Sequence, residues 1–132
     1  MSKMQRTKGQ VGEREVCTIL RQELGIEVNR NWQAQSAVGG ADIMLPGWAI
    51  EVKRAKVLRV ASWWTQAALQ ANACGLRPLL VYRPDRGSWM ARMSMCDLRQ
   101  DLKCHHQVEM ALECWVNFYK HTTEGRHIHA DT

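Results

Sequence analysis

Two acidic residues and a lysine, Asp42, Glu51 and Lys53, lie around a Pro46-Gly47 pair that is typical of a tight turn. If the flanking segments form a hairpin with an even-length loop centred on that pair, Asp42 lies directly opposite Glu51. Side chains alternate across a strand, so Lys53 shares the face of Glu51. The spacing therefore predicts two carboxylates and one ammonium group on the same face of a hairpin. An odd-length turn would move Asp42 away from Glu51.

Two opposed carboxylates destabilise a hairpin unless something binds between them. Their Cβ atoms would lie about 5 Å apart, where two negative charges repel by roughly 3 kcal/mol at an effective dielectric near 20. A divalent cation removes this repulsion, and Mg²⁺ is commonly held by one or two carboxylates with water and phosphate oxygens. This face therefore predicts a metal site. The opposite face is apolar and is predicted to lie in the core; it carries Ile43, Leu45, Trp48, Ile50 and Val52.

The composition predicts one basic domain. The chain has 132 residues, enough for a single core, and we expect one domain over residues 1–132. Its core is expected at about residues 8–95, followed by a helical segment at about 96–120 and a polar tail at 121–132. Lys and Arg number 18 against 13 Asp and Glu, a formal net charge of +5 that favours a polyanionic partner. Apolar runs are short and the first residues form no hydrophobic signal, so we expect no membrane insertion and a cytoplasmic or nucleoid-associated protein.

The cysteines do not suggest a disulfide framework. Five of them are scattered at positions 17, 74, 96, 104 and 114 without paired short spacings, which favours reduced thiols. Cys104, His105 and His106 with Cys114 form an alternative zinc set. Their spacing matches no common zinc-ligand pattern, so the hairpin remains the preferred metal site.

The first predicted helix adds a third acid. Residues 10–24 carry a helical apolar stripe that ends at Gly25, a residue suited to a helix C-cap. Glu13 lies on that stripe, whereas Glu15 is turned away from it. An acid on an apolar stripe either lies near an exposed helix start, where the helix dipole favours it, or points toward a site.

The remaining elements follow from periodicity and turn residues. Residues 26–32 alternate like a strand, and 33–40 form a loop of small and polar residues. A helix is expected at 61–74 with Ser62 as its N-cap and Gly75 as its end. Residues 78–83 are typical of an interior strand, 88–95 of a further strand, and 108–119 of a C-terminal helix.

Three motifs in this order resemble the PD-(D/E)XK nuclease superfamily. They are Lys8-Gly9-Gln10-Val11-Gly12-Glu13-Arg14-Glu15, Gly40-Ala41-Asp42 and Ile50-Glu51-Val52-Lys53. Within the superfamily, the likeness is closest to archaeal-type and phage Holliday junction resolvases, and it covers roughly residues 8 to 83. It implies an α/β fold with a restriction-endonuclease-like core (αβββαβ), in which a mixed central sheet is flanked by helices. Ala41 replaces the motif proline and the gap from Asp42 to Glu51 is short, but neither departure removes a charged group.

The resemblance implies a catalytic set by position. The residues are Glu13, Asp42, Glu51 and Lys53, with weaker carry-over to Gln66 on the following helix and Ser36 in the preceding loop. The implied cofactor is Mg²⁺, for which Mn²⁺ is expected to substitute. Its expected ligands are Asp42, Glu51 and the backbone carbonyl of Val52, with Glu13 binding through water or completing a second position.

The implied function is a metal-dependent, structure-selective DNA endonuclease. Holliday junction resolution is the favoured activity, because the sequence offers no base-reading module and shape is then the feature to recognise. Two symmetric cuts suit a homodimer with one site per subunit. The alternatives are another superfamily endonuclease acting on flaps, nicks or duplex DNA, and a non-catalytic DNA-binding protein. Phosphate contacts are expected from Lys3, Arg6, Lys8, Arg54, Lys56 and Arg59.

Overall fold

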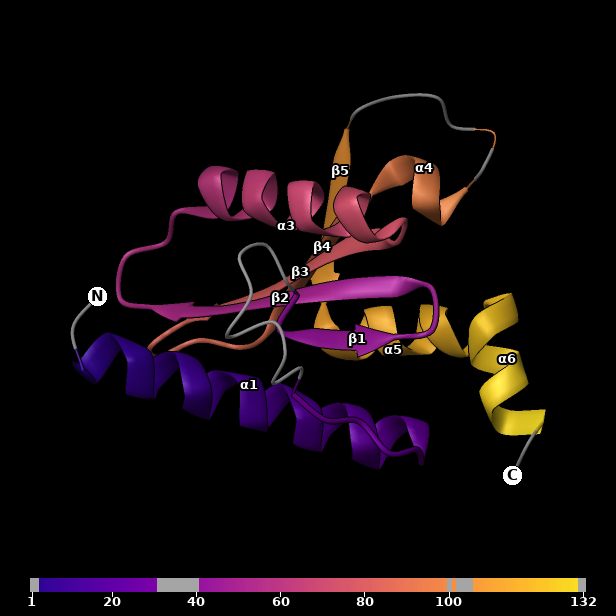
Figure 1. Ribbon diagram of the computed structural model, residues 1–132, viewed down its shortest axis with the longest axis horizontal. Helices are drawn as coiled ribbons and strands as arrows, with labels where there is room; N and C mark the ends of the chain where they lie inside the picture. Colours follow the sequence, from indigo (N-terminus) through magenta and orange to yellow (C-terminus); the bar gives the residue numbers. More distant parts are fainter. Residues whose placement is uncertain (1–2, 31–40, 100, 102–105, 131–132) are drawn as a thin grey trace.

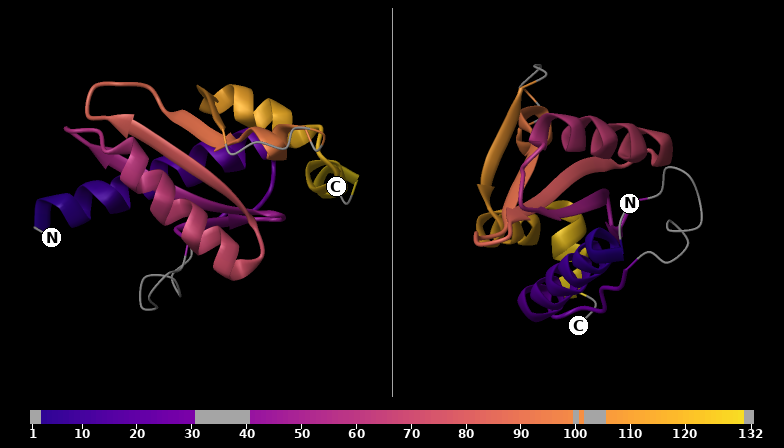
Figure 2. Two further views of the ribbon diagram at one scale, coloured as in Figure 1. Left: turned by 90° about the horizontal axis from the view of Figure 1, so that it is seen from above. Right: turned by 90° about the vertical axis from the view of Figure 1, so that its left-hand side faces the viewer.

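A mixed five-stranded sheet organises the protein. The computed structural model describes residues 3–30, 41–99, 101 and 106–130. The strand order is β1-β2-β3-β4-β5, in which β2 and β3 are parallel and the other neighbours are antiparallel. Helix α3 covers one face of the sheet, while α1 and α5 lie against the other (Figures 1 and 2). The predicted α/β class, with a mixed central sheet flanked by helices, is confirmed.

The helices and strands follow one another along the chain in the order labelled in Figure 1. Their bounds are α1 (Lys3–Leu24), β1 (Ile43–Leu45), β2 (Trp48–Ala55), α3 (Val60–Cys74), β3 (Arg77–Pro84), β4 (Met90–Ser94), α4 (Met95–Leu98), β5 (Gln107–Ala111), α5 (Leu112–Lys120) and α6 (Thr123–Ala130).

Strands β1 and β2 form the predicted hairpin. Ile43 pairs with Ile50 and Leu45 with Trp48, which leaves Pro46 and Gly47 as a two-residue turn. Gly47 has φ of +87°, a conformation that glycine adopts without strain. The even-length loop is therefore confirmed. In the described part of the chain, β1 begins at Ile43, so the edge of β2 beyond Ile50 has no neighbouring strand on that side.

The two faces of the hairpin have the predicted environments. The apolar face is buried in the main core, with Trp48 and Ile50 fully buried among residues of α1 and α5. The other face lies under α3, whose buried Ala67 and Ala71 allow the helix backbone to come close to the sheet. The hairpin thus presents Glu51 on the α3 side, as the alternation predicts.

The strand predicted at residues 26–32 is not formed in its described part. Residues 26–30 make only one isolated bridge, between Arg30 and Ile43. The Val28 carbonyl oxygen accepts a 2.6 Å hydrogen bond from Arg21 Nε. A side chain therefore supplies the donor that the backbone of a neighbouring strand would otherwise provide. The first of the three strands expected in the αβββαβ order is therefore reduced to a bridge.

The C-terminal part of the chain differs from the prediction at two places. The helix expected at 108–119 begins only at Leu112, and residues 107–111 form β5 instead. Pairing with β4 along all five residues explains the difference, and Glu109 also accepts hydrogen bonds from Tyr82 on β3 and Arg92 on β4. The polar tail expected at 121–132 contains helix α6.

The helix starts also differ in detail from the predictions. Helix α1 begins at Lys3, well before the expected residue 10. Helix α3 begins at Val60 with Arg59 as its N-cap, so Ser62 lies inside the helix and donates a 3.4 Å hydrogen bond to the Arg59 carbonyl oxygen. Among the helices that the structure describes, none combines the length and apolar character needed to cross a bilayer.

Candidate active site

Asp42 is hydrogen-bonded to the edge of β2 that lies beyond the end of β1, which we call the open edge. Its Oδ2 atom accepts a 2.9 Å hydrogen bond from the backbone N–H of Val52. The N–H and C=O groups of one strand residue point to the same edge of the strand, so the Val52 carbonyl is directed to this edge as well. Among the described residues, the short β1 therefore leaves a backbone carbonyl and a carboxylate at an edge of β2 that has no strand partner.

Glu51 lies at the centre of a second group of side chains. Its Oε1 atom is 3.4 Å from Lys53 Nζ and 3.4 Å from Gln66 Nε2 on α3. Glu51 is 4% exposed, so these polar partners offset part of the cost of burying a carboxylate. Lys53 keeps 27% of its side chain exposed and remains accessible to a ligand.

Glu13 reaches the same region from α1. The residue is 9% exposed, and its Oε2 atom accepts a 2.6 Å hydrogen bond from Arg30 Nε. Its carboxyl group is close enough to Asp42 for each group to change the pKa of the other. The structure therefore brings Glu13 together with Asp42, Glu51, Lys53 and Gln66, as the sequence predicts. Ser36 lies outside the described residues.

The acidic groups are difficult to ionise together. Burial, and then the charge of Glu51, raises the pKa of Asp42 from its ordinary 3.8 to about 7. Burial is also the main cause of the raised pKa of Glu13, against which the Arg30 hydrogen bond acts. The pKa of Glu51 is raised by burial and held down partly by Lys53. A site of this kind gains strongly from a bound cation.

The raised pKa of Asp42 predicts that stability falls with rising pH. Between its unfolded pKa near 3.8 and its folded pKa of about 7, the folded protein holds a proton that the unfolded chain has lost. Asp42→Asn should remove the part of this dependence that Asp42 causes and, at about 1.4 kcal/mol per pKa unit, be more stable than wild type by roughly 2–4 kcal/mol at about pH 8. Urea unfolding in EDTA at several pH values measures the difference. A difference that stays constant from about pH 5 to about pH 8 would contradict the raised pKa.

The donor set suits a hard divalent cation with an incomplete protein shell. Asp42 and Glu51 supply two carboxylates, and the Val52 carbonyl supplies a neutral oxygen at the same edge. Within the described ranges, no three His, Cys, Asp or Glu side chains converge closely enough to hold a metal ion together. Mg²⁺ suits such a site, because it commonly keeps several waters and uses one or two carboxylates with substrate phosphate oxygens.

The basic residues expected to contact phosphate have unequal environments. Lys8 forms a 2.8 Å ion pair with Asp85, and Arg54 lies 3.4 Å from Glu15. Lys56 and Arg59 are exposed in the connection between β2 and α3. Lys3 is also exposed, at the start of α1, while the side chain of Arg6 is not among those described.

Arg30 and the contacts of Glu15 are features near the candidate site that the sequence reasoning missed. Arg30 is 7% exposed and forms an ion pair with Glu13. Its signal was available, because Arg30 is two residues after the buried Val28 and hence on the same side of an extended segment. Glu15 points away from Asp42 as predicted, and it accepts a 3.1 Å hydrogen bond from Trp89 Nε1.

Comparisons with known proteins match most of the chain. A sequence model of the family described as "Phage putative PDDEXK endonuclease" matches residues 4–128. Protein D14 of Escherichia phage T5 is 27% identical over 119 residues, which cover 70% of this chain and 72% of that protein. Among solved structures, Hjc, a Holliday junction resolvase from the archaeal hyperthermophile Archaeoglobus fulgidus, aligns with 80% of this chain and 85% of its own, at 20% identity and a TM-score of 0.49.

Proposed function

The chain belongs to the phage PDDEXK endonuclease family, and from this membership we propose that it is a metal-dependent, structure-selective DNA endonuclease that resolves four-way junctions. The observation that supports the proposal is the group of side chains at the open edge of β2. Asp42 and Glu51 there have raised pKa values, and Lys53 lies 3.4 Å from Glu51. Two carboxylates that repel each other beside an accessible ammonium group suit hydrolysis of a phosphodiester with a divalent cation.

The proposed cofactor is Mg²⁺, and Mn²⁺ is expected to substitute for it. Asp42, Glu51 and the Val52 carbonyl would hold the ion, and Glu13 would bind it through water. When bound, the ion supplies a Lewis acid for the phosphoryl oxygen and makes a coordinated water more acidic. Arg30 keeps the Glu13 carboxylate at the edge of the site through the 2.6 Å hydrogen bond.

Lys53 is proposed to act on the reacting phosphate. Its ammonium group is partly exposed and lies on the Glu51 side of the hairpin, where it can orient the attacking water or stabilise negative charge that develops in the transition state. Gln66 hydrogen-bonds the same Glu51 oxygen from α3. Gln66 is therefore proposed to fix the orientation of the Glu51 carboxylate.

The two acids of α1 provide a matched comparison. Glu13→Gln should slow DNA cleavage by about 10²-fold, because it removes a charge beside Asp42 and a hydrogen-bonded carboxylate of the site. Glu15→Gln should keep the rate within about threefold, since Glu15 contacts Arg54 and Trp89 and not the acidic group. Single-turnover cleavage rates with Mg²⁺ measure both. The reverse order of effects would mean that Glu15 is the helix acid of the site.

Branched DNA is proposed as the substrate because the described surface has basic residues but no element that reads base edges. A four-way junction has two-fold symmetry, so paired cuts call for a homodimer with one site per subunit. The protein should be incubated with Mg²⁺ and a synthetic four-way junction, beside linear duplex, flap and single-stranded controls. Paired symmetric nicks near the branch point are expected, with little cutting of the controls.

The same experiment separates the alternatives. Preferential cutting of flaps or nicked duplex would replace junction resolution by another activity of the same family. Specific DNA binding without cleavage in Mg²⁺ or Mn²⁺ would indicate a non-catalytic DNA-binding protein. The oligomeric state, measured by sedimentation in the presence and absence of the junction, tests the homodimer separately.

A further inference from the structure

The connection between β2 and α3 exposes two adjacent aliphatic side chains. Val57 is 65% exposed and Leu58 is 43% exposed, and the flanking Lys56 and Arg59 are exposed as well. A single exposed aliphatic residue is common on protein surfaces. Two in succession, bracketed by basic residues on a connection that begins just after the site strand, indicate a surface for contact.

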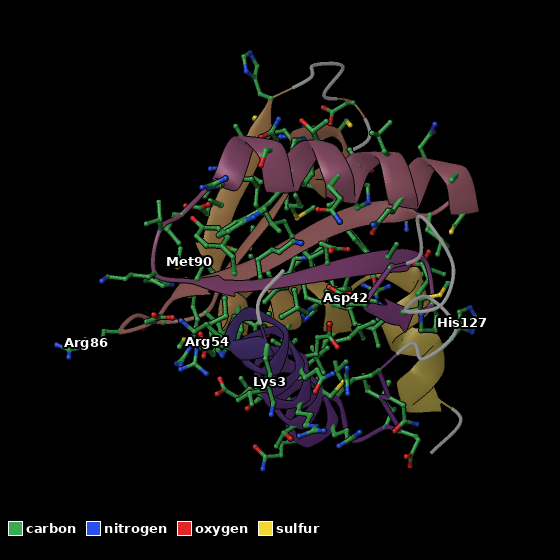
Figure 3. The ribbon with its side chains drawn as sticks, turned by 60° about the vertical axis from the view of Figure 1, so that its left-hand side comes forward. Lys3, Asp42, Arg54, Arg86, Met90 and His127 are labelled. Carbon is green, nitrogen blue, oxygen red and sulfur yellow. The ribbon has the colours of Figure 1, made fainter. Side chains whose placement is uncertain are left out.

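This connection lies at the end of the molecule where basic residues gather. The start of α1, the β2–α3 connection and the β3–β4 turn lie at the left in Figure 1, and Arg54 and Arg86 lie on the same side of Asp42 in Figure 3. Lys8, Arg54 and Lys56 all act to lower the pKa of Asp85 in that turn. An open pocket at this end is lined by Lys3, Met4, Lys8, Val11 and Arg54. Apolar and basic groups are therefore combined over this end.

We propose that Val57 and Leu58 form a wedge that enters the base stack at a discontinuity in the DNA, while Lys56 and Arg59 contact the flanking phosphates. This inference rests on the proposed function, and it assigns the selection of branched DNA to the wedge. Separating two stacked bases in continuous duplex is unfavourable, and the cost is lowest where pairing is already interrupted. The wedge therefore favours a branch point over continuous duplex.

The chain length between wedge and site fixes where the cut should fall. Val57 is four residues after Lys53, so their Cα atoms are at most about 14 Å apart. Successive nucleotides of one strand are separated by about 3.4 Å along the axis of the DNA helix. Cleavage should therefore occur within about four nucleotides of the branch point.

DNA fits this surface better than a second copy of the chain. A two-fold interface would bring identical patches together, and it would set Lys56 and Arg59 near the same basic residues of the partner. Like charges at such short range repel. DNA has negatively charged backbones around a stack of apolar bases. Its phosphates complement the basic residues of the connection, and its base stack complements the two aliphatic side chains.

The test compares two double variants with matched exposure. Val57→Ser/Leu58→Ser removes the wedge, and Leu69→Ser/Leu98→Ser changes residues that are 67% and 37% exposed on α3 and α4. Each protein is mixed in EDTA with a four-way junction that carries 2-aminopurine at the branch point, and cleavage is measured separately with Mg²⁺. Wild type and the control should raise the fluorescence on binding. The wedge variant should lose that rise and cut the junction at least tenfold more slowly, with linear-duplex binding within about twofold of wild type.

Three other outcomes distinguish failure of the wedge from failure of the nuclease proposal. If the wedge variant unstacks and cuts like wild type, the wedge is wrong and the nuclease proposal stands. If wild type cuts no DNA, the nuclease proposal fails, and the fluorescence alone then judges the wedge; no rise with wild type overturns it. If the variant loses junction and duplex binding equally and sediments as a smaller species than wild type, the connection is a subunit interface instead.

Discussion

Asp42→Asn is expected to reduce the rate of DNA cleavage by about 10³-fold or more while leaving the fold intact. The amide oxygen of Asn can still accept the hydrogen bond from the Val52 N–H, so the register of the hairpin should persist. The change removes one of the two proposed metal carboxylates, and a metal contributes several kcal/mol of transition-state stabilisation, or about a factor of ten per 1.36 kcal/mol. Single-turnover cleavage of a labelled junction with Mg²⁺ measures the loss.

Asp97→Asn is the matched control for this variant. Asp97 lies on α4, 3.9 Å from Arg77 near the turn of the hairpin. Its pKa is shifted by burial and by Arg77 but by none of the acids of the site, so its replacement should leave the cleavage rate within about threefold. Junction binding by Asp42→Asn should stay near that of wild type, because the proposed phosphate contacts come from other residues. Full cleavage by Asp42→Asn would remove Asp42 from the proposed metal site.

Lys53→Ala is expected to lower the maximal cleavage rate by about 10²–10³-fold, the usual cost of removing one donor that stabilises transition-state charge. The substitution also removes the cation 3.4 Å from Glu51, which holds the pKa of that carboxyl group down. Part of the loss should therefore be recovered at higher pH, where Glu51 ionises without help. Rates at saturating protein, measured across pH with Mg²⁺, test both components.

Lys56→Ala separates chemistry from phosphate binding. Lys56 is exposed beyond the end of β2, so its loss should weaken junction binding and reduce the salt dependence of binding by about one unit of slope. The maximal rate should be nearly unchanged. If Lys53→Ala behaved in the same way as Lys56→Ala, Lys53 would be a phosphate contact and not a group that acts in the reaction.

The hairpin and the phase of α1 could be predicted because local rules decide them. Pro46 and Gly47 mark the turn, and alternation then places Glu51 and Lys53 on one face. The helical period places Glu13 inward among Val16 and Leu20. In both places the burial pattern agrees with the local preference for one secondary structure, so few alternatives remain.

The features that could not be predicted depend on contacts between distant segments. Residues 107–111 form β5 because the backbone of β4 provides an antiparallel partner, which no local pattern contains. The segment 26–30 forms no strand because Arg21 binds the Val28 carbonyl from α1. The inward position of Arg30 could be read from the alternation after Val28, but its partner Glu13, 17 residues earlier in the chain, could not.

The short β1 has a consequence for solubility as well as for chemistry. A strand edge without a neighbour offers backbone groups on which a strand of another molecule can pair, and proteins commonly oppose this with charged side chains. The open edge of β2 carries Asp42, fastened to the Val52 N–H, and the partly exposed Lys53. The same charges that suit the edge to hydrolysis thus discourage edge-to-edge association, and neutralising them removes both functions at once.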